Sequence, residues 1–324
     1  MHFRSLLLSV YLLAAGNTYA QVDGNTAAYR NTGSNKYFRV HYDNDFFTNS
    51  DYYYSQGISL ELAHPGIGKF LLAKLLIQPT GNDMVYGLAL NDFGYTPTSI
   101  SSNEILYGDR PFSAVLYLKT FAIATDTSRN RRISSSLSTG IIGPAAGGKQ
   151  MQTGIHRWLK NIIPLGWQHQ VQNDVVLNYQ VNYDQQVWAF RNLILLNAGA
   201  ELQAGTLKDK LSAGFNLMLG KLNSPYKGTR QARTFKKHFN CHLYVAPQIS
   251  LVGYDASLQG GIFNKTSPYT IAAKDISRVT FQANAGIVLN IGKLHLEYCQ
   301  SYLSKEFRTG NFHRWAGLKI GLLF

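Results

Sequence analysis

The sequence contains only two cysteines, Cys241 and Cys299, which lie far apart in the chain. This number excludes a scaffold held by several disulfide bonds and leaves open one bridge or two packing residues. Long apolar runs are also missing after the N-terminus. The longest candidate, residues 67–77, contains Lys69 and Lys74 and is shorter than the ~18 to 20 residues of a membrane-spanning helix. The sequence therefore predicts no helical membrane anchor.

Acidic residues are scarce, with 18 Asp and Glu against 31 Lys and Arg, and the formal net charge is +13. This balance favours anionic partners such as nucleic acid, anionic lipid or phosphorylated glycolipid. However, residues 1–20 have a basic Arg4, an apolar run and small residues before a cleavage site, which is typical of a secretory signal peptide. Export argues against nucleic acid and predicts a mature chain that begins at Gln21.

Apolar and polar residues alternate with a period of two through most of the remaining chain. In residues 175–183 every second residue is Val, Leu or Tyr, whereas positions 178, 180 and 182 are Asn or Gln; residues 281–290 alternate similarly. Such alternation predicts strands with one apolar and one polar face. A soluble sandwich would bury the apolar faces, whereas a membrane barrel would turn them toward lipid.

Three further features favour the barrel. The strand candidates have about ten residues or more, which is enough to cross a bilayer at a tilt. The chain contains 20 Tyr and 17 Phe, as expected for aromatic girdles at both membrane interfaces. The last segment, RWAGLKIGLLF, alternates and ends in the aromatic Phe324, as the C-terminal strand of an outer-membrane barrel does.

The alternation gives thirteen strand candidates: residues 36–43, 54–63, 83–92, 112–124, 131–143, 171–184, 189–204, 208–221, 239–252, 254–263, 277–291, 293–304 and 311–324. Bacterial single-chain barrels normally have an even number of strands, so we expect about twelve and one miscounted candidate. The predicted fold is all-β: one closed antiparallel transmembrane β-barrel over residues 21–324, with short helices in loops. The helix candidates lie in 64–82 and 144–170.

The connection at 41–57, HYDNDFFTNSDYYYSQG, is too rich in acidic, amide and aromatic residues for a simple turn. Asp43, Asn44 and Asp45 offer hard oxygen ligands of the kind that calcium prefers, and Ser55 follows them. D-N-D is also a common turn composition. Strand parity places this connection at the same end of the barrel as those at 93–111 and 144–170.

In the 144–170 connection, Gln152 and His156 are four residues apart and would share one face of a helix. A histidine beside a carbonyl group that calcium polarises can act as a general base for hydrolysis. A lone histidine is more often structural, so the residues alone leave both interpretations open.

Four segments resemble, in the same order, motifs of the outer-membrane lipid A 3′-O-deacylases. They are YDNDFFTNSDYYYSQG (42–57), GDRPFSAVLYL (108–118), GPAAGGKQMQTGIHRW (143–158) and GWQHQ (166–170). No single constraint of a barrel demands all four. The resemblance implies a twelve-stranded barrel that removes an ester-linked acyloxyacyl chain from lipid A in the outer leaflet, with calcium (Ca2+) as cofactor and a histidine base.

By motif position, the resemblance implies a role for each candidate residue. Asn44 and Asp45 would bind calcium or orient the oxyanion, Ser55 matches a Thr/Ser site, and Gln152 precedes the base His156 by one helical turn. The favoured mechanism is direct attack by water, from which His156 takes a proton. A covalent route through a Ser55–His156 pair is the rival.

Basic residues could contact the substrate in two places. Arg110, in the D-R-P motif, would either bind a phosphate or fix its loop, and the segment 224–238 could meet lipopolysaccharide phosphates or be a solvated loop. The chain departs from the family pattern in having Asp174-Val175 after GWQHQ, where Glu-Pro is often found. Residues 157–165 also contain no acidic residue or tyrosine.

Two other functions fit a barrel of this kind. One is an outer-membrane phospholipase, but that class carries an H-x-S motif, and none of the nine histidines is followed two residues later by serine. The other is a non-enzymatic channel or adhesion barrel, which would not need these motifs at one end. The sequence indicates neither the acyl pattern of the substrate nor an oligomeric state.

Overall fold

The computed structural model of the chain describes residues 24–48, 52–80, 82–229 and 239–324. The predicted signal peptide at residues 1–20 lies outside the described residues and stays a prediction, and so does most of the basic segment 224–238. No helix among the described residues is long and apolar enough to cross a membrane.

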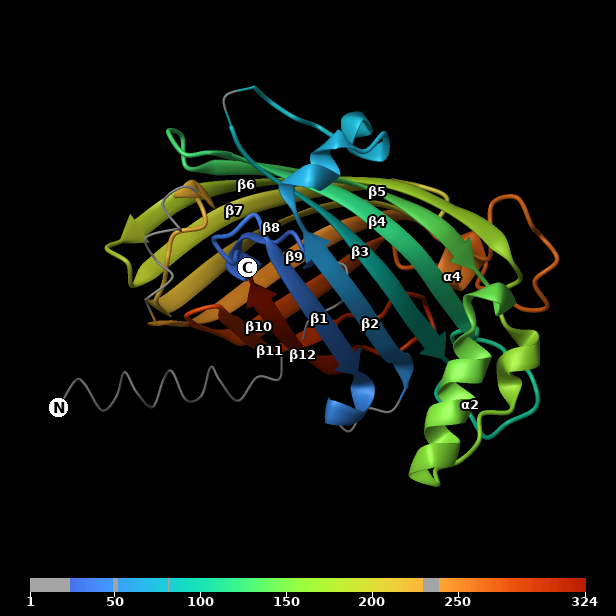
Figure 1. Cartoon of the computed structure of the whole chain (residues 1–324). Helices are drawn as coiled ribbons and strands as arrows, with labels where there is room; N and C mark the ends of the chain where they lie inside the picture. Colours follow the sequence, from blue (N-terminus) through green and yellow to red (C-terminus); the bar gives the residue numbers. More distant parts are fainter. Residues whose placement is uncertain (1–23, 49–51, 81, 230–238) are drawn as a thin grey trace.

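Within the described residues, twelve antiparallel strands close into a barrel, and the last strand pairs with the first (Figure 1). The strands are β1 (Tyr37–Asn44), β2 (Tyr53–Ala63), β3 (Asp83–Thr96), β4 (Ser113–Asp126), β5 (Arg131–Ile142), β6 (Asp174–Phe190), β7 (Ile194–Gly205), β8 (Lys208–Lys221), β9 (Phe239–Asp255), β10 (Val279–Ile291), β11 (Leu294–Leu303) and β12 (His313–Leu323). Closure leaves no free sheet edge. The closed twelve-stranded barrel predicted from the sequence is confirmed.

The miscounted candidate is 254–263. There β9 continues to Asp255, and the chain then turns into the short helix α4 (Ala256–Gln259). The Asp255 carboxylate accepts a hydrogen bond of 2.9 Å from the backbone N–H of Ser257, so it caps this helix and the strand ends. The helix predicted in 64–82 is also different: it consists of two short 3-10 helices, η4 (Pro65–Lys69) and η5 (Leu72–Leu75).

The two faces of the strands have the polarity that the alternation predicts. On β6 the apolar Val175 and Leu177 are more than half exposed on the outside, whereas Asn178 and Gln180 are buried inside. The same pattern holds on β10, where Phe281 faces outward. The apolar faces therefore point out of the barrel, which is the membrane-barrel alternative and not the soluble sandwich.

The segment before β1 enters the barrel, a feature that the sequence does not predict. Residues 24–36 include the 3-10 helix η2 (Ala28–Arg30), in which every residue is buried. The backbone carbonyl of Asn25 accepts a hydrogen bond of 3.0 Å from Arg39 on β1. On the far side, the carbonyl of Thr26 accepts one of 3.4 Å from Arg132 on β5. The segment therefore reaches across the lumen; we call it the N-terminal plug.

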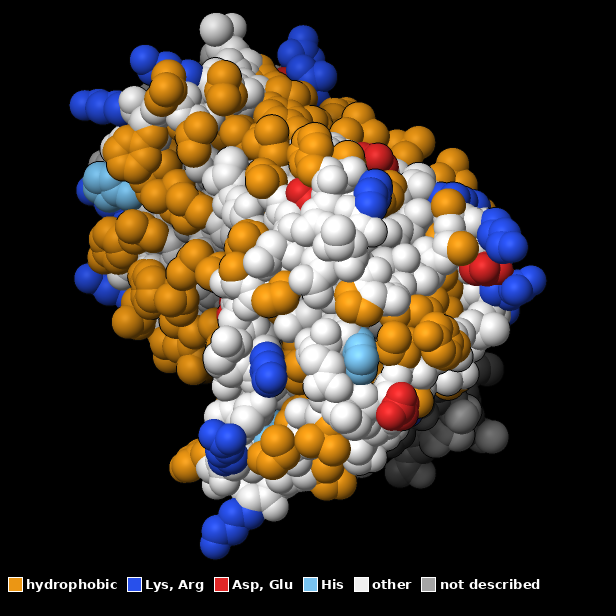
Figure 2. Space-filling view, turned by 90° about the vertical axis from the view of Figure 1, so that its right-hand side faces the viewer, with side chains coloured by type: hydrophobic (Ala, Val, Ile, Leu, Met, Phe, Trp, Pro, Cys, Tyr) orange, Lys and Arg blue, Asp and Glu red, His pale blue; other side chains and the backbone are white. Residues whose placement is uncertain are grey.

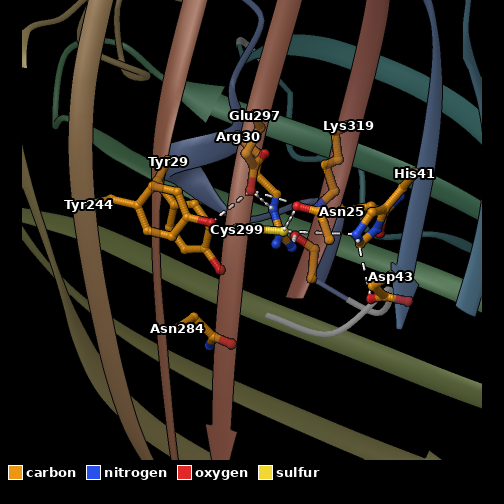
Figure 3. A network of polar contacts seen from close by, with 12 residues as sticks. Asn25, Tyr29, Arg30, His41, Asp43, Tyr244, Asn284, Glu297, Cys299 and Lys319 are labelled. Carbon is orange, nitrogen blue, oxygen red and sulfur yellow. Dashed lines mark hydrogen bonds and ion pairs between the residues drawn. The ribbon is translucent and has the colours of Figure 1, made fainter. Parts of the chain in front are cut away.

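Charge and ring contacts hold the N-terminal plug against the opposite wall (Figure 3). Arg30 Nε lies 3.0 Å from the carboxylate of Glu297 on β11, and both side chains are almost completely buried. Tyr29 stacks on Tyr244 of β9 with ring centroids 4.0 Å apart. Cys299 lies in the same region and, like Cys241, is a free thiol, so the two cysteines form no bridge.

The two ends of the barrel carry different connections. One end holds the long connections 97–112, 143–173 and 256–278, and the helix α2 (Gly148–Leu159) projects from it (Figure 1). The opposite end holds the start of β1, the end of β12 and the described part of the basic segment, residues 224–229. The connections that follow β1, β3 and β5 therefore share one end, as strand parity predicts.

Candidate active site

Helix α2 lies outside the barrel wall, beside the ends of β2, β3 and β4 (Figure 1). Its first residue, Gly148, packs on Ala114 of β4 and on the ring of Trp167. A Cβ atom on Gly148 would come within 2.4 Å of Ala114 Cβ and 2.8 Å of that ring, so only glycine allows this approach. The start of α2 is thus fixed on the outer face of the wall.

The strand beneath α2 contains a bulge at Ser55. Tyr54 pairs with Tyr95 and Gln56 pairs with Gly94, so Ser55 is an extra residue in β2 that has no partner in the β2–β3 register. A bulge re-aims the side chains next to it. The recess between the wall and α2 is lined by Ser55, Gln56, Asp92, Gly94, Gly148, Gln152 and Trp167. The structure therefore brings Ser55 and Gln152, predicted from separate motifs, into one recess outside the barrel.

Hydrogen bonds orient both candidate side chains of α2. Gln152 is buried, and its Oε1 accepts a hydrogen bond of 2.7 Å from Trp167 Nε1. One turn later, Nδ1 of the half-buried His156 lies 2.5 Å from the carbonyl oxygen of Ile162. A carbonyl can only accept, so this contact selects the tautomer with a proton on Nδ1 and a lone pair on Nε2. Nε2 is then the atom that can accept a proton.

The residues of the D-N-D segment point in different directions. Asp43 faces the lumen, where its Oδ1 accepts a hydrogen bond of 2.8 Å from Tyr54 and its Oδ2 lies 3.4 Å from His41 Nε2 (Figure 3). Successive residues of a strand alternate between faces, so the next residue, Asn44, faces outward. The expected ligand set of three residues is therefore reduced to Asn44 and Asp45.

Asn44 and Asp45 lie at the end of β1, beside the recess. The last β1–β2 pair is Asp43 with Gly57, so Asn44 follows one residue beyond it, and Gln56, which precedes Gly57, lines the recess. Asn44 Oδ1 accepts a hydrogen bond of 2.8 Å from the backbone N–H of Phe46, which fixes the amide. Asp45 begins the 3-10 helix η3 (Asp45–Thr48) and is buried. Both residues offer oxygen donors, the donor type that hard cations such as calcium prefer.

The comparisons with known proteins agree with this architecture. A family model described as outer membrane protein LpxR matches residues 6–324. The chain belongs to the LpxR family. This membership confirms the family that the four motifs predicted, and with it the outer-membrane location.

Comparison with solved structures shows a shared fold. LpxR from Salmonella typhimurium is similar with a TM-score of 0.73 and 18% sequence identity, over 89% of this chain and 100% of that chain. The β-domain of the Bordetella autotransporter BrkA is less similar, with a TM-score of 0.43 and 9% identity, over 89% of this chain and 97% of that chain. No curated protein sequence matches the chain.

In this LpxR-family chain, Arg110 is buried and has protein partners. Its guanidinium forms an ion pair with Glu306, donates a hydrogen bond of 2.9 Å to Ser257 and lies 3.8 Å from the ring centre of Tyr95. Burial lowers the pKa of Arg110, but the Glu306 carboxylate outweighs it, and the net shift is upward. These contacts join three connections at the mouth of the barrel, which favours the loop-fixing role over phosphate binding.

The LpxR-family site also contains residues that the sequence analysis did not single out. Thr96 Oγ1 lies 2.8 Å from Ser55 Oγ, and Trp167 holds Gln152. Asp92 lines the recess from an outward position of β3, where alternation predicts an apolar residue. A carboxylate on the apolar face of a strand is the signal that could have identified it. Trp167 lies within the GWQHQ motif.

Proposed function

We propose that this chain hydrolyses the ester that links the 3′ acyloxyacyl chain to lipid A, in the outer leaflet of the outer membrane. One observation carries the proposal. Ser55 and Gln152 line a recess on the outside of the barrel wall, and the base candidate His156 lies one turn after Gln152 on helix α2. A lipid can reach this position by lateral diffusion in the membrane. Membership in the LpxR family and the order of the four motifs support the same activity.

The orientation of the barrel follows from its two ends. In outer-membrane barrels the periplasmic connections are short and the extracellular ones are longer. The end that carries α2 holds the two longest connections, 143–173 and 256–278, and the start of β1 and the end of β12 lie at the opposite end. The recess would then lie at the level of the outer leaflet, where lipid A is found.

His156 would act as the general base. Its Nδ1–H is held by the Ile162 carbonyl, so Nε2 can take a proton from a water molecule that attacks the ester. Gln152, fixed by Trp167, can donate its amide N–H groups to the substrate. Donors at the end of β1, including the amide of Asn44, can stabilise the oxyanion that forms on the carbonyl oxygen.

Calcium fits the donor set only in part. Asn44 and Asp45 would hold the ion, which when bound would polarise the ester carbonyl. Among the described residues, no three His, Cys, Asp or Glu side chains form a group that could hold a metal ion. The remaining ligands would therefore be amide or carbonyl oxygens, water or the substrate, all of which calcium accepts.

The contacts of Ser55 favour the water route over a covalent one. A serine nucleophile needs a base within hydrogen-bond reach. The hydrogen bond that the structure gives Ser55 Oγ joins it to the Thr96 hydroxyl, which is not a base. Ser55 would then bind or position the substrate or the attacking water.

Mass spectrometry of lipid A from Gram-negative cells with and without the gene tests the activity. We expect the gene to remove the mass of the 3′ acyloxyacyl group. His156→Ala should lower turnover about a hundredfold or more, as loss of a general base does. His64→Ala, which alters an exposed histidine at the opposite end, is the matched control and should leave the product unchanged.

Other outcomes would identify a different function. Release of fatty acid from phospholipid, with intact lipid A, would indicate a barrel phospholipase. Intact lipids together with ion conductance would indicate a channel. Near-native deacylation by His156→Ala would contradict the assignment of the base.

A further inference from the structure

The second half of α2 and the segment after it expose large apolar side chains. In α2 only Gly148 and Gln152 are buried. Beyond them, Trp158 is 82% exposed, Leu159 58% and Ile162 60%. The residues after Gln152 thus leave the barrel wall without burying their apolar groups, and such a surface needs an explanation.

The same connection carries positive charge and no negative charge. Residues 143–173 contain Lys149, Arg157 and Lys160 but no Asp or Glu. Arg157 and Lys160 flank the two exposed apolar residues Trp158 and Leu159. Figure 2, which looks onto this end of the barrel, shows hydrophobic and Lys/Arg side chains side by side on the lobe at its lower edge, where α2 lies. An apolar surface flanked by the cations Arg157 and Lys160 is complementary to an anionic lipid surface.

The position of α2 agrees with this chemistry. The helix projects from the barrel end and extends beyond the wall (Figure 1). Below the recess, the outer wall continues into the apolar belt through Leu60, Leu90 and Leu118, each more than a third exposed. The apolar surface of α2 is therefore next to the surface that the barrel presents to the acyl chains.

We propose that residues 157–165 and the second half of α2 lie in the outer-leaflet interface, where they bind phosphorylated lipids. Trp158, Leu159 and Ile162 enter the upper acyl region, and Arg157 and Lys160 contact lipid phosphates. An interfacial helix of this kind buries its apolar side roughly 5–10 Å into the boundary between head groups and acyl chains. The proposal rests on the orientation given under the proposed function.

This placement has a consequence for the reaction. His156 directly precedes Arg157 on the same helix, so anchoring the helix at the phosphates sets the depth of the base. The esters that link acyl chains to the sugar lie just below the phosphates. The interface would thus bring His156 to the level of the scissile bond without extraction of the lipid from the leaflet.

Tryptophan fluorescence in reconstituted vesicles tests the depth of Trp158. The chain contains four tryptophans; Trp167 and Trp315 are buried, and Trp188 is exposed on β6, whose last residue lies at the opposite end. Full-length protein with Trp188→Phe therefore has one exposed tryptophan. The same protein with Trp158→Phe supplies the background, and the difference between the two spectra is the signal of Trp158.

The vesicles contain phosphatidylcholine and phosphatidylglycerol, with or without lipid brominated near the top of the acyl chain. We expect a blue-shifted Trp158 emission that brominated lipid quenches and aqueous acrylamide does not. Arg157→Gln combined with Lys160→Gln should weaken quenching by brominated lipid in these anionic vesicles. Lys149→Gln, nearer the wall, is the matched control for loss of one charge.

Two results would overturn the proposal. Trp158 emission typical of water, with quenching by acrylamide, would place the segment outside the membrane. Emission that shifts only at high protein-to-lipid ratio, without quenching by brominated lipid, would mean that a second copy of the chain covers it. Because quenching needs no turnover, His156→Ala should give the same spectra. Absence of deacylation by the native protein, together with normal quenching, would refute the proposed function and leave this inference intact.

Discussion

The N-terminal plug should contribute to the stability of the barrel through the charge of Arg30. The substitution Arg30→Met tests this contribution, because it removes the charge and keeps an apolar side chain of similar length. Arg30 and Glu297 are each 2% exposed, with a nitrogen and an oxygen 3.0 Å apart. Removing one partner of a buried ion pair typically costs about 3–5 kcal/mol. Lys319 Nζ remains 3.6 Å from the same carboxylate oxygen, so Glu297 keeps one cation. We therefore expect the lower limit, about 3 kcal/mol.

Equilibrium unfolding in urea, with the protein folded into vesicles, measures this loss. About 3 kcal/mol corresponds to a change of roughly 150-fold in the unfolding constant, at 1.36 kcal/mol per tenfold. A double-mutant cycle with Glu297→Gln should give a coupling of about 2 kcal/mol, because the two residues are in contact.

Arg129→Met is the matched control for this experiment. The side chain of Arg129 is 69% exposed and pairs with Asp126 at 3.2 Å, outside the lumen. Such a surface pair contributes about 0–1 kcal/mol. If Arg30→Met costs no more than Arg129→Met, or if Arg30 and Glu297 show no coupling, the plug does not stabilise the barrel through this pair.

Three further predictions concern the site. Chelation should abolish deacylation and calcium should restore it, with Asp45→Asn mimicking chelation in a folded barrel; full activity in excess chelator would exclude calcium. Ser55→Ala should cause a partial loss of turnover, whereas a loss as deep as that of His156→Ala, with an acyl-enzyme trapped in the native protein, would favour the covalent route. Gly148→Ala should displace α2 and lower turnover without changing the stability in urea, because the new Cβ would lie 2.4 Å from Ala114 Cβ. Gly154→Ala is the control, because its Cβ would meet nothing within 4 Å. Equal effects of the two substitutions would refute the role of close packing at Gly148.

Much of the barrel could be predicted because the period-two pattern is local. Each strand shows its two faces in its own residues, and closure requires an even number of strands. The pattern failed at 254–263, where alternation continues past the point at which Asp255 caps α4. A cap depends on backbone geometry that a hydrophobic pattern does not record.

The candidate site also combines features that short segments predict with features that they do not. The spacing of Gln152 and His156 on one helical face follows from nearby residues. The direction of Asp43 and the burial of Arg110 do not, because their partners come from other elements. Arg110 meets Glu306 and Ser257, which are 196 and 147 residues away.

The sequence by itself determined the class of fold and the family, and it indicated candidate residues for the site, because alternation, helical spacing and motif order are properties of short segments. Only the tertiary structure decided that the N-terminal plug reaches across the lumen, and that α2 lies outside the wall over a bulge at Ser55. The physical reason is that these features depend on contacts between distant parts of the chain: Arg30 and Glu297 are 267 residues apart. Such contacts form only when the barrel closes, and no local pattern encodes them.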